Sequence, residues 1–255
     1  MSISSSAKSA EWARDWLEGR RVLVTGGTGG IGGAIAECFR DAGASVHATG
    51  ATEAECEAAR ATTDCSDSIT YSVLDVRSND AIERIVGDLD DLDVVINCAG
   101  VIRRDQERDP VVFEAVVDIN LNGTMRVCEA SLEKLAANGG CIINIASMLS
   151  FFGGGLVPGY SASKGGIAQL TKSLAIAYAS QGVRVNAIAP GWIATPLTKA
   201  LQDDPARAGP ILARTPMGRW GMPEDLQGIT LFLASPYAAF MTGTIIPIDG
   251  GYSVS

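Results

Sequence analysis

Histidine is almost absent from this chain, since His47 is the single one among 255 residues. Cysteines number six, and no two of them form a Cys-x-x-Cys pair. Zinc sites draw on histidines and closely spaced cysteines, and serine hydrolases need a histidine beside the nucleophile. The scarcity therefore argues against a bound metal and against hydrolysis by a serine–histidine pair.

Positive charge is scarce as well. The chain has 20 Lys and Arg against 29 Asp and Glu, a net charge of −9. No stripe of lysine and arginine follows the sequence, so we expect no nucleic-acid partner. No uninterrupted apolar stretch reaches the length of a membrane span, so we expect no membrane segment either.

The cysteines and the N-terminal residues indicate a compartment. Several cysteines lie in apolar runs, as Cys141 does, which predicts buried, reduced thiols. Residues 1–21 contain no apolar core of signal-peptide length. We therefore expect a cytoplasmic protein. The cysteines are Cys38, Cys56, Cys65, Cys98, Cys128 and Cys141.

From residue 21 onward, short apolar runs alternate with segments of helical periodicity. This alternation predicts βαβ units and a parallel sheet with helices on both faces. The runs are apolar almost throughout, as burial of both faces requires. We expect one α/β domain, doubly wound around seven parallel strands. The predicted strands are 21–25, 45–49, 69–74, 93–97, 141–146, 183–188 and 244–248, and the predicted helices are 31–42, 78–89, 111–137, 160–180 and 224–234.

Two further segments lie outside this alternation. Residues 1–19 combine a polar tail with a short amphipathic turn that carries Trp12 and Trp16, and we expect an arm packed on the domain of residues 20–255. Residues 191–222 are rich in proline and glycine and follow a predicted strand. Because ligands bind beyond the carboxyl ends of such strands, we expect residues 191–222 to form a flap over the substrate.

Residues 22–39 place an apolar run, a glycine-rich turn and a helical pattern in direct succession. This order brings a pyrophosphate onto a helix N-terminus, and glycine lets the backbone turn tightly beside it. The spacing is Gly26-x3-Gly30-x-Gly32, and no Gly-Lys-Ser/Thr follows, so the turn is not a P-loop. Taken alone, the glycines predict an ordinary tight turn as readily as a nucleotide site.

Tyr160 and Lys164 lie four residues apart in YSASK, and Ser147 lies thirteen residues before the tyrosine. Residues four apart share one face of a helix. A free tyrosine has a pKa of about 10, and a nearby cation stabilises the phenolate and lowers that value. We expect the Lys164 ammonium to make Tyr160 an acid and base for proton transfer at an alcohol or carbonyl. Taken one at a time, Tyr160 also suits a half-buried aromatic residue, Lys164 a solvated charge on a helix, and Ser147 a turn residue at the end of a strand.

These residues, with further motifs in the same order, resemble the short-chain dehydrogenase/reductase family over nearly the whole chain after residue 20. The resemblance implies a Rossmann fold. Cys98 departs from the family's Asn-Asn-Ala-Gly motif, and we expect an inert thiol there. The motifs are TGGTGGIG (25–32), LDV (74–76), NCAG (97–100), INLNG (119–123), Ser147 with YSASK (160–164), PGWIATP (190–196) and DGG (249–251).

The resemblance also implies roles. Tyr160 exchanges the proton, Ser147 holds the substrate oxygen, Lys164 also reaches the nicotinamide ribose, and Asn120 kinks its helix and carries a relay water. A nicotinamide dinucleotide is then the hydride carrier, and the family's habit predicts a homotetramer. The implied cofactor-binding residues are Gly26, Thr28, Gly30, Ile31, Gly32, Thr49, Asp75, Val76, Asn97, Ala99, Gly100, Tyr160, Lys164, Pro190, Gly191, Ile193 and Thr195.

The end of the second predicted strand bears on the choice between NAD and NADP. An acidic residue there favours NAD, and an arginine there or in the glycine turn favours the 2′-phosphate of NADP. The chain has small residues at 48–52 and Gly29 in the turn, and the nearby His47 is mostly neutral at pH 7. We expect NAD, with NADP as the alternative.

Three segments narrow the resemblance to the gluconate and 2-deoxy-D-gluconate dehydrogenases of the family, which oxidise sugar acids. They are AGVIRRDQE (99–107), IASMLSFFGG (145–154) and GRWGMPEDL (218–226). Arg103 and Arg104 suit a bidentate hold on a carboxylate, or else a solvated pair that balances nearby acidic residues. The candidate substrate residues are Arg103, Arg104, Met148, Gly154 and Trp192.

Aromatic side chains leave other substrates open. They suit an apolar pocket for a hydrophobic ketone or a 3-oxoacyl thioester, or else they pack the flap down. A third hypothesis is a nucleotide-sensing protein that has lost catalysis. The presence of all four predicted catalytic residues argues against it: Asn120, Ser147, Tyr160 and Lys164. The side chains that suit an apolar pocket are Phe151, Phe152, Leu156, Trp192 and Trp220.

Overall fold

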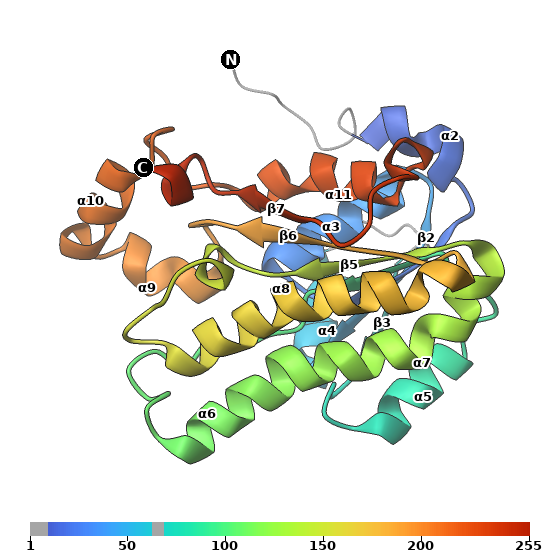
Figure 1. The fold of residues 1–255 in the computed structure, drawn as a ribbon, viewed down its shortest axis with the longest axis horizontal. Coiled ribbons are helices and arrows are strands. Elements are labelled where there is room, and N and C mark those ends of the chain that lie inside the picture. The colour runs from blue at the N-terminus through green and yellow to red at the C-terminus, as the bar shows by residue number, and fades with distance from the viewer. Residues whose placement is uncertain (1–9, 63–68) are drawn as a thin grey trace.

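The computed structural model describes residues 10–62 and 69–255. Seven strands form one parallel sheet in the order β3-β2-β1-β4-β5-β6-β7, with helices on both faces (Figure 1). The predicted doubly wound architecture is therefore confirmed. The strands are β1 (Arg21–Thr25), β2 (Ser45–Gly50), β3 (Ile69–Val73), β4 (Val94–Asn97), β5 (Cys141–Ile145), β6 (Arg184–Pro190) and β7 (Ile245–Ile248).

Alternating side chains of each strand enter two separate hydrophobic cores. On β1, Val22 and Val24 pack with Ile35 of one core, while Leu23 packs with Val127 of the other. Successive residues of a strand point to opposite faces, so a strand covered on both faces is apolar at nearly every position. This requirement explains why β1, β4 and β5 were predictable as continuous apolar runs.

The helices divide between the two faces. One face is covered by α5 (Asn79–Gly87), α7 (Gly123–Asn138) and α8 (Pro158–Tyr178), with α6 (Pro110–Val117) packed against α8. The other face is covered by α3 (Gly30–Asp41), α4 (Glu53–Thr62) and α11 (Gln227–Ala234). No helix in the described ranges combines the length and the apolar character needed to cross a membrane.

Beyond the arm, three α-helices in the described residues were not predicted. They are α4, α9 (Lys199–Gln202) and α10 (Pro205–Arg214). Only Cys56 and Ala59 are buried in α4, so its periodic signal is weak, and α10 contains Pro210. The predicted helix 111–137 is interrupted by a π-helical segment, η2 (Asp118–Asn122), which sequence periodicity does not reveal.

Residues 10–17 pack on the domain as a short arm. Ala13 and Leu17 are fully buried, and the Trp16 ring meets that of Tyr237 edge-on, with 5.4 Å between the ring centroids. Residues 1–9, the remainder of the predicted arm, and Cys65 lie outside the described ranges. The other five cysteines are free, and four of them are buried.

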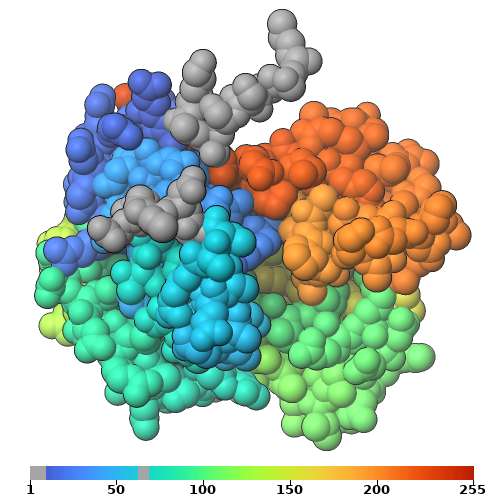
Figure 2. All heavy atoms as spheres, turned by 180° about the vertical axis from the view of Figure 1, so that it is seen from behind, coloured from blue at the N-terminus to red at the C-terminus, as the bar shows by residue number. Residues whose placement is uncertain are grey.

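All strands end at one edge of the sheet, where the functional motifs gather. The register pairs Thr25 of β1 with Asn97 of β4, and Asn97 with Asn144 of β5. The glycine turn, the loop before α6, the segment before α8 and the flap all leave this edge. Figure 2 shows a hollow there, between the blue and cyan atoms of the N-terminal half and the orange atoms of α9 and α10.

Leu23→Ala should lower the free energy of unfolding by about 2–5 kcal/mol, because Leu23 is completely buried between the sheet and its helices. Val111→Ala is the control, since Val111 is 74% exposed. Urea denaturation followed by circular dichroism measures both variants. Equal effects would contradict the placement of Leu23 in a core.

Candidate active site

Ser147, Tyr160 and Lys164 meet at the carboxyl edge of the sheet. Ser147 follows β5, while Tyr160 and Lys164 lie on the first two turns of α8. The Ser147 side chain forms a hydrogen bond with Tyr160, and Lys164 Nζ lies 5.6 Å from the centroid of the Tyr160 ring. The spacing in YSASK therefore places the ammonium beside the phenol ring, as expected.

Asn120 lies in the π-helical segment η2 and is 1% exposed. Its Oδ1 accepts the Val101 N–H at 2.8 Å, and its Nδ2 donates to the Val101 carbonyl at 3.0 Å and to Ser163 Oγ at 3.1 Å. A widened helical turn displaces the backbone enough for such side-chain contacts. The break expected at Asn120 is therefore present, and it anchors the loop after β4.

Burial decides the protonation of the tyrosine and the lysine. Burial raises the pKa of Tyr160 to about 12, and the hydrogen bond with Ser147 lowers it in part. Burial also lowers the pKa of Lys164 to about 8. The pKa of Tyr160 is thus raised and not lowered as expected, because burial is the largest influence on it. Lys164 Nζ donates to the Ile145 carbonyl at 2.6 Å.

The glycine turn has the geometry of a phosphate cradle. Gly26 has a φ of +65°, and a Cβ there would lie 2.8 Å from the Ala99 backbone. A Cβ on Gly32 would lie 2.1 Å from the Gly26 carbonyl oxygen, so only glycine lets α3 pack on the turn. By contrast, nothing lies within 4 Å of a Cβ on Gly29, and no side chain caps α3 there. The start of α3 is therefore open beside Gly29, which leaves room for a pyrophosphate at the helix N-terminus, although the Gly32 N–H is engaged by Cys98.

Other predicted cofactor residues surround this turn. Thr195 of the flap lies opposite Gly30, with its side chain 3.8 Å from the position of a Gly30 Cβ, and Thr28 contacts Gly50 at the end of β2 in the same way. Gly100 lies over the Asn120 amide and Lys164 Nζ. The turn, the end of β2, the loop after β4 and the flap therefore border one site. Ile31 packs partly against the core, and Ile193 and Pro190 are buried at the base of the flap.

Several predicted cofactor residues support this site from beneath. Thr49 is 1% exposed, and its carbonyl accepts the Gly27 N–H at 2.9 Å. Asn97 is 3% exposed, and its Nδ2 donates to Asn144 Oδ1 at 2.9 Å, while Asn144 Nδ2 donates to Thr171 Oγ1 at 3.0 Å. The side chains of Thr49 and Asn97 are therefore not open to a ligand, because alternation along β2 and β4 turns them into the interior.

The segment after β3 is divided between surface and interior. The Asp75 carboxylate pairs with Arg77 at 2.7 Å, and this hydrogen bond holds the pKa of Asp75 below its usual value. Val76 is buried and packs against Gly123 at the start of α7. Asp75 is partly open to a ligand at this edge, while Val76 is not.

An acidic side chain that sequence reasoning missed lies at the end of β2. Glu55 Oε2 accepts the Ala51 N–H at 2.7 Å and lies 3.1 Å from the position of a Gly50 Cβ, beside Thr28 of the glycine turn. The signal was Thr52-x-x-Glu55, a capping-box pattern at the start of α4. His47 carries no charge here, because burial lowers its pKa further.

Aromatic side chains pack together along residues 191–222, the predicted flap. The Trp192 ring packs edge-on against Trp220 and Tyr252, with centroids 5.9 and 6.3 Å away, and Arg214 lies 4.3 Å from the Tyr252 ring centroid. Phe152 contacts Tyr252 as well. Trp192, Trp220 and Phe152 thus pack against other aromatic rings, which agrees with the second of the two alternatives, packing of the predicted flap. Phe151 and Leu156 remain about half exposed.

The two arginines among the predicted substrate residues differ in exposure to solvent. Arg103 is exposed, and Arg104 is partly buried. Burial and the nearby Arg207 of α10 lower the pKa of Arg104, while Asp105 and Glu107 raise it. The guanidinium groups of Arg104 and Arg207 therefore lie near each other. Neither has an ion-pair partner in the part of the chain that the structure describes. Arg207 was not found from sequence, because α10 was not predicted.

Met148 and Gly154 line the segment between Ser147 and Tyr160. Met148 is 4% exposed, so it supports the segment from below. The Gly154 N–H donates to Ser161 Oγ at 3.1 Å, and a Cβ on Gly154 would lie 2.7 Å from Val157. Gly191 likewise packs closely on Asp249, at the foot of the flap.

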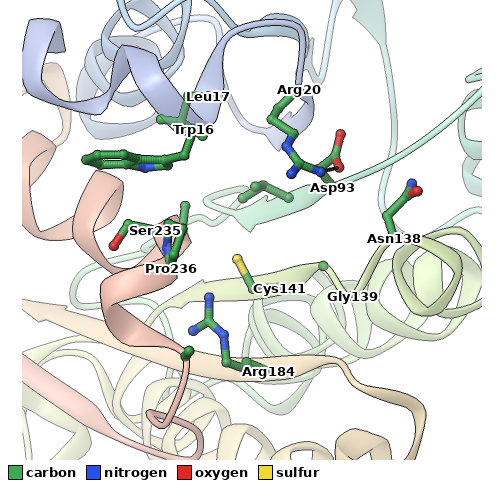
Figure 3. Close-up of a pocket in the computed structure, with 14 residues that line it drawn as sticks. Trp16, Leu17, Arg20, Asp93, Asn138, Gly139, Cys141, Arg184, Ser235 and Pro236 are labelled. Carbon is green, nitrogen blue, oxygen red and sulfur yellow. Dashed lines mark hydrogen bonds and ion pairs between the residues drawn. The ribbon is translucent and has the colours of Figure 1, made fainter.

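A well-formed cavity lies at the opposite edge of the sheet. It measures about 190 Å³ and lies where β4, β5 and β6 begin, among Trp16, Arg20, Cys141 and Arg184 (Figure 3). None of the predicted catalytic residues lines it. Within residues 10–62 and 69–255, no group of three or more His, Cys, Asp or Glu side chains is arranged to hold a metal ion.

Cys98 is placed as an inert thiol. Its sulfur lies 3.2 Å from the position of a Gly32 Cβ, beneath the glycine turn. Burial raises its pKa to about 11, so almost no reactive thiolate exists near neutral pH. The expectation of an unreactive side chain is supported by this environment.

Comparison with known proteins gives consistent results. The family model described as enoyl-(acyl carrier protein) reductase matches residues 26–253. A 2-dehydro-3-deoxy-D-gluconate 5-dehydrogenase of Bacillus subtilis (strain 168) is 39% identical over 242 residues, which cover 92% of this chain and 95% of that relative. A 3-oxoacyl-(acyl-carrier-protein) reductase of Rickettsia bellii is 34% identical over 241 residues, which cover 92% and 97%.

Among solved structures, similarity extends over nearly the whole fold. A gluconate 5-dehydrogenase from Burkholderia cenocepacia J2315, in complex with NADP and tartrate, superposes with a TM-score of 0.88 at 32% identity. The match covers 95% of this chain and 99% of that one.

Proposed function

The chain belongs to the short-chain dehydrogenase/reductase family of oxidoreductases, and from this premise we propose that it interconverts a secondary alcohol and a ketone of a sugar acid. The observation that carries the proposal is the hydrogen-bonded pair of Ser147 and Tyr160, with Lys164 one helical turn away, at the edge that also holds the glycine turn.

The glycine turn and the first turn of α3 would hold the dinucleotide, with Thr195 and Gly100 on its other sides. The nicotinamide of that cofactor supplies or accepts the hydride. The protein's own part is to bind and orient the substrate and to handle its proton. The predicted roles of the remaining cofactor residues stay proposals, except that Thr49, Val76 and Asn97 act from beneath the site.

Tyr160 is the proposed proton donor in reduction. Its raised pKa keeps the phenol protonated near neutral pH, which suits an acid. In oxidation the phenolate must act as the base, so that direction gains from rising pH. Ser147 would donate to the substrate oxygen and steady the charge that develops on it. Lys164, fixed on the Ile145 carbonyl, keeps its ammonium close to both groups.

Two neighbouring arginines, Arg104 and Arg207, support a substrate that carries a carboxylate. Arg207 lowers the pKa of Arg104, while Asp105 and Glu107 raise it in part, so a bound carboxylate would further stabilise the charged guanidinium of Arg104. The relatives named above include enzymes of sugar acids, and one was solved with tartrate, a dicarboxylate. We propose that residues 191–222, which carry Arg207, cover the bound substrate.

A second candidate is the reduction of a 3-oxoacyl thioester or another hydrophobic ketone. The relative from Rickettsia bellii favours it. The packing of Trp192 and Trp220 against each other disfavours it, because these rings are engaged in closing the flap. A nucleotide sensor without catalysis has no supporting observation, since Ser147, Tyr160 and Lys164 are all in place.

NAD is the cofactor we propose, although the relative from Burkholderia cenocepacia binds NADP. The Glu55 carboxylate lies at the end of β2, where the adenosine ribose would rest, and it would repel a 2′-phosphate. No arginine or lysine stands in the glycine turn to offset it. We also propose that the protein is a homotetramer, as the resemblance to the family implies, and that it is cytoplasmic.

Tyr160→Phe should reduce turnover of D-gluconate and related acids by about 10²–10⁴-fold, because the ring stays but the proton donor is lost. Affinity for the dinucleotide should remain nearly unchanged. Nicotinamide absorbance measures turnover, and fluorescence titration measures affinity. In the wild type, oxidation should accelerate between pH 7 and pH 9. The control is Tyr237→Phe, a ring that is 73% exposed. A wild type that binds the dinucleotide yet turns over no acid, polyol or ketone would contradict the proposed function.

Arg104→Gln and Arg207→Gln should each raise KM for a sugar acid by roughly 10- to 100-fold, because a charged hydrogen bond to the carboxylate is lost. KM for a neutral polyol should change little. Arg108→Gln, an exposed arginine of the same loop, is the control. Equal losses with acid and polyol would show that the two arginines do not recognise the carboxylate.

Glu55→Gln should improve NADPH binding relative to NADH by about fivefold, since one negative charge beside the 2′-phosphate disappears while the amide oxygen still accepts the Ala51 N–H. Dissociation constants from quenching of tryptophan fluorescence give the ratio directly. Glu57→Gln removes the same charge from an exposed position of α4. An unchanged ratio in Glu55→Gln would remove Glu55 from cofactor selection.

A further inference from the structure

Glu107 is a buried carboxylate next to the proposed acid. It lies in the loop between β4 and α6 and is 1% exposed. One carboxylate oxygen accepts the Arg103 N–H at 2.7 Å, and the other accepts the Tyr160 N–H at 2.7 Å. No lysine or arginine forms an ion pair with it in residues 10–62 and 69–255. A buried charge without an ion pair is costly, so these two N–H groups define its environment.

The helix that carries Tyr160 has no cap of its own. The N-cap residue of α8 is Val157, whose side chain accepts no hydrogen bond, and Pro158 at the next position has no N–H. Tyr160 is the third residue of α8, whose N–H an N-cap side chain usually accepts. Glu107 supplies this acceptor from a distant part of the chain. It also fits closely, since a Cβ on Gly159 would lie 3.3 Å from its Oε2.

The loop of Arg103 and Arg104 is fixed to the same place. The Asp105 N–H donates to the Leu156 carbonyl at 2.9 Å, just before α8 begins. Asp105 has a φ of +67°, a left-handed conformation that aspartate tolerates better than most residues. The loop is thus tied to the entry of α8 at two points, the Asp105 amide and the Glu107 carboxylate.

We propose that Glu107 is a positioning residue that holds Arg104, through the backbone of its loop, and Tyr160 in register with each other. Its two oxygens join the backbone of the arginine loop to the backbone of Tyr160. A sugar acid whose carboxylate rests on Arg104 then presents its reacting carbon at a fixed distance from the phenol. The inference rests on the proposed function, in which Tyr160 exchanges the proton.

The charge of Glu107 also acts on the phenol. The groups that face Tyr160 are Ser147, whose hydrogen bond lowers the pKa of Tyr160, Cys98 and Glu107, which raise it, and the ammonium of Lys164. Neutralising Glu107 therefore lowers the pKa of Tyr160. A residue that merely stabilised the fold would not move this titration.

The test compares Glu107→Gln with Asp109→Asn. Gln has nearly the same shape but one acceptor oxygen for two N–H groups, so one contact is lost. Asp109 carries the same charge in the same loop, but it caps α6 through the Val111 N–H and does not contact Tyr160. In Glu107→Gln we expect kcat for a sugar acid to fall roughly tenfold, with the rise of the oxidation rate displaced to lower pH. Asp109→Asn should keep the wild-type profile.

Amide hydrogen exchange gives a readout that needs no activity. In Glu107→Gln, the peptide covering residues 158–162 should exchange roughly tenfold faster than in the wild type or in Asp109→Asn. Unchanged exchange together with an unchanged pH profile would overturn the inference. So would loss of the native circular dichroism spectrum in Glu107→Gln, which would assign Glu107 to folding rather than positioning. A wild type without turnover would refute the proposed function alone, while the exchange experiment still tests the contact.

Discussion

Burial of both faces of the parallel sheet confines chemistry to the edge where the strands end. After Arg21, every position of β1, β4 and β5 is buried, so polar side chains that meet ligands must come from loops and helix starts beyond these strands. The glycine turn follows β1, Ser147 follows β5, and the flap follows β6. The fold thereby gathers residues that lie more than 150 positions apart in the sequence into one site.

Desolvation then sets the character of that site. Tyr160 and Lys164 lose water together, so the phenol resists ionisation and the ammonium loses its proton more readily than in solution. The pair does not act as a simple cation beside an acid, because the lysine is engaged with the Ile145 carbonyl. Glu107, which accepts the Tyr160 backbone N–H, also raises the pKa of the phenol. The protonated phenol is consequently the resting form that the fold favours.

Much of this could be predicted from local sequence, and the exceptions share a cause. All seven strands were predictable within a few residues, and the central strands most directly, because a run buried on both faces is apolar at nearly every position. The spacing of Tyr160 and Lys164 was informative because helical geometry fixes it. The contacts of Glu55 and Glu107 were not predictable. Glu55 folds back across a turn, and Glu107 reaches a helix 53 residues further along the chain, which no local pattern encodes.

The buried amides of Asn97 and Asn144 have a consequence for how the sheet assembles. They are direct partners across β4 and β5, and Thr171 of α8 completes the chain of hydrogen bonds. If β4 slid by one residue along β5, Asn97 would face Ile143 or Ile145, and two amides would be stranded in hydrocarbon. Apolar strands alone tolerate sliding, so a polar rung at the centre of the sheet selects a single alignment during folding.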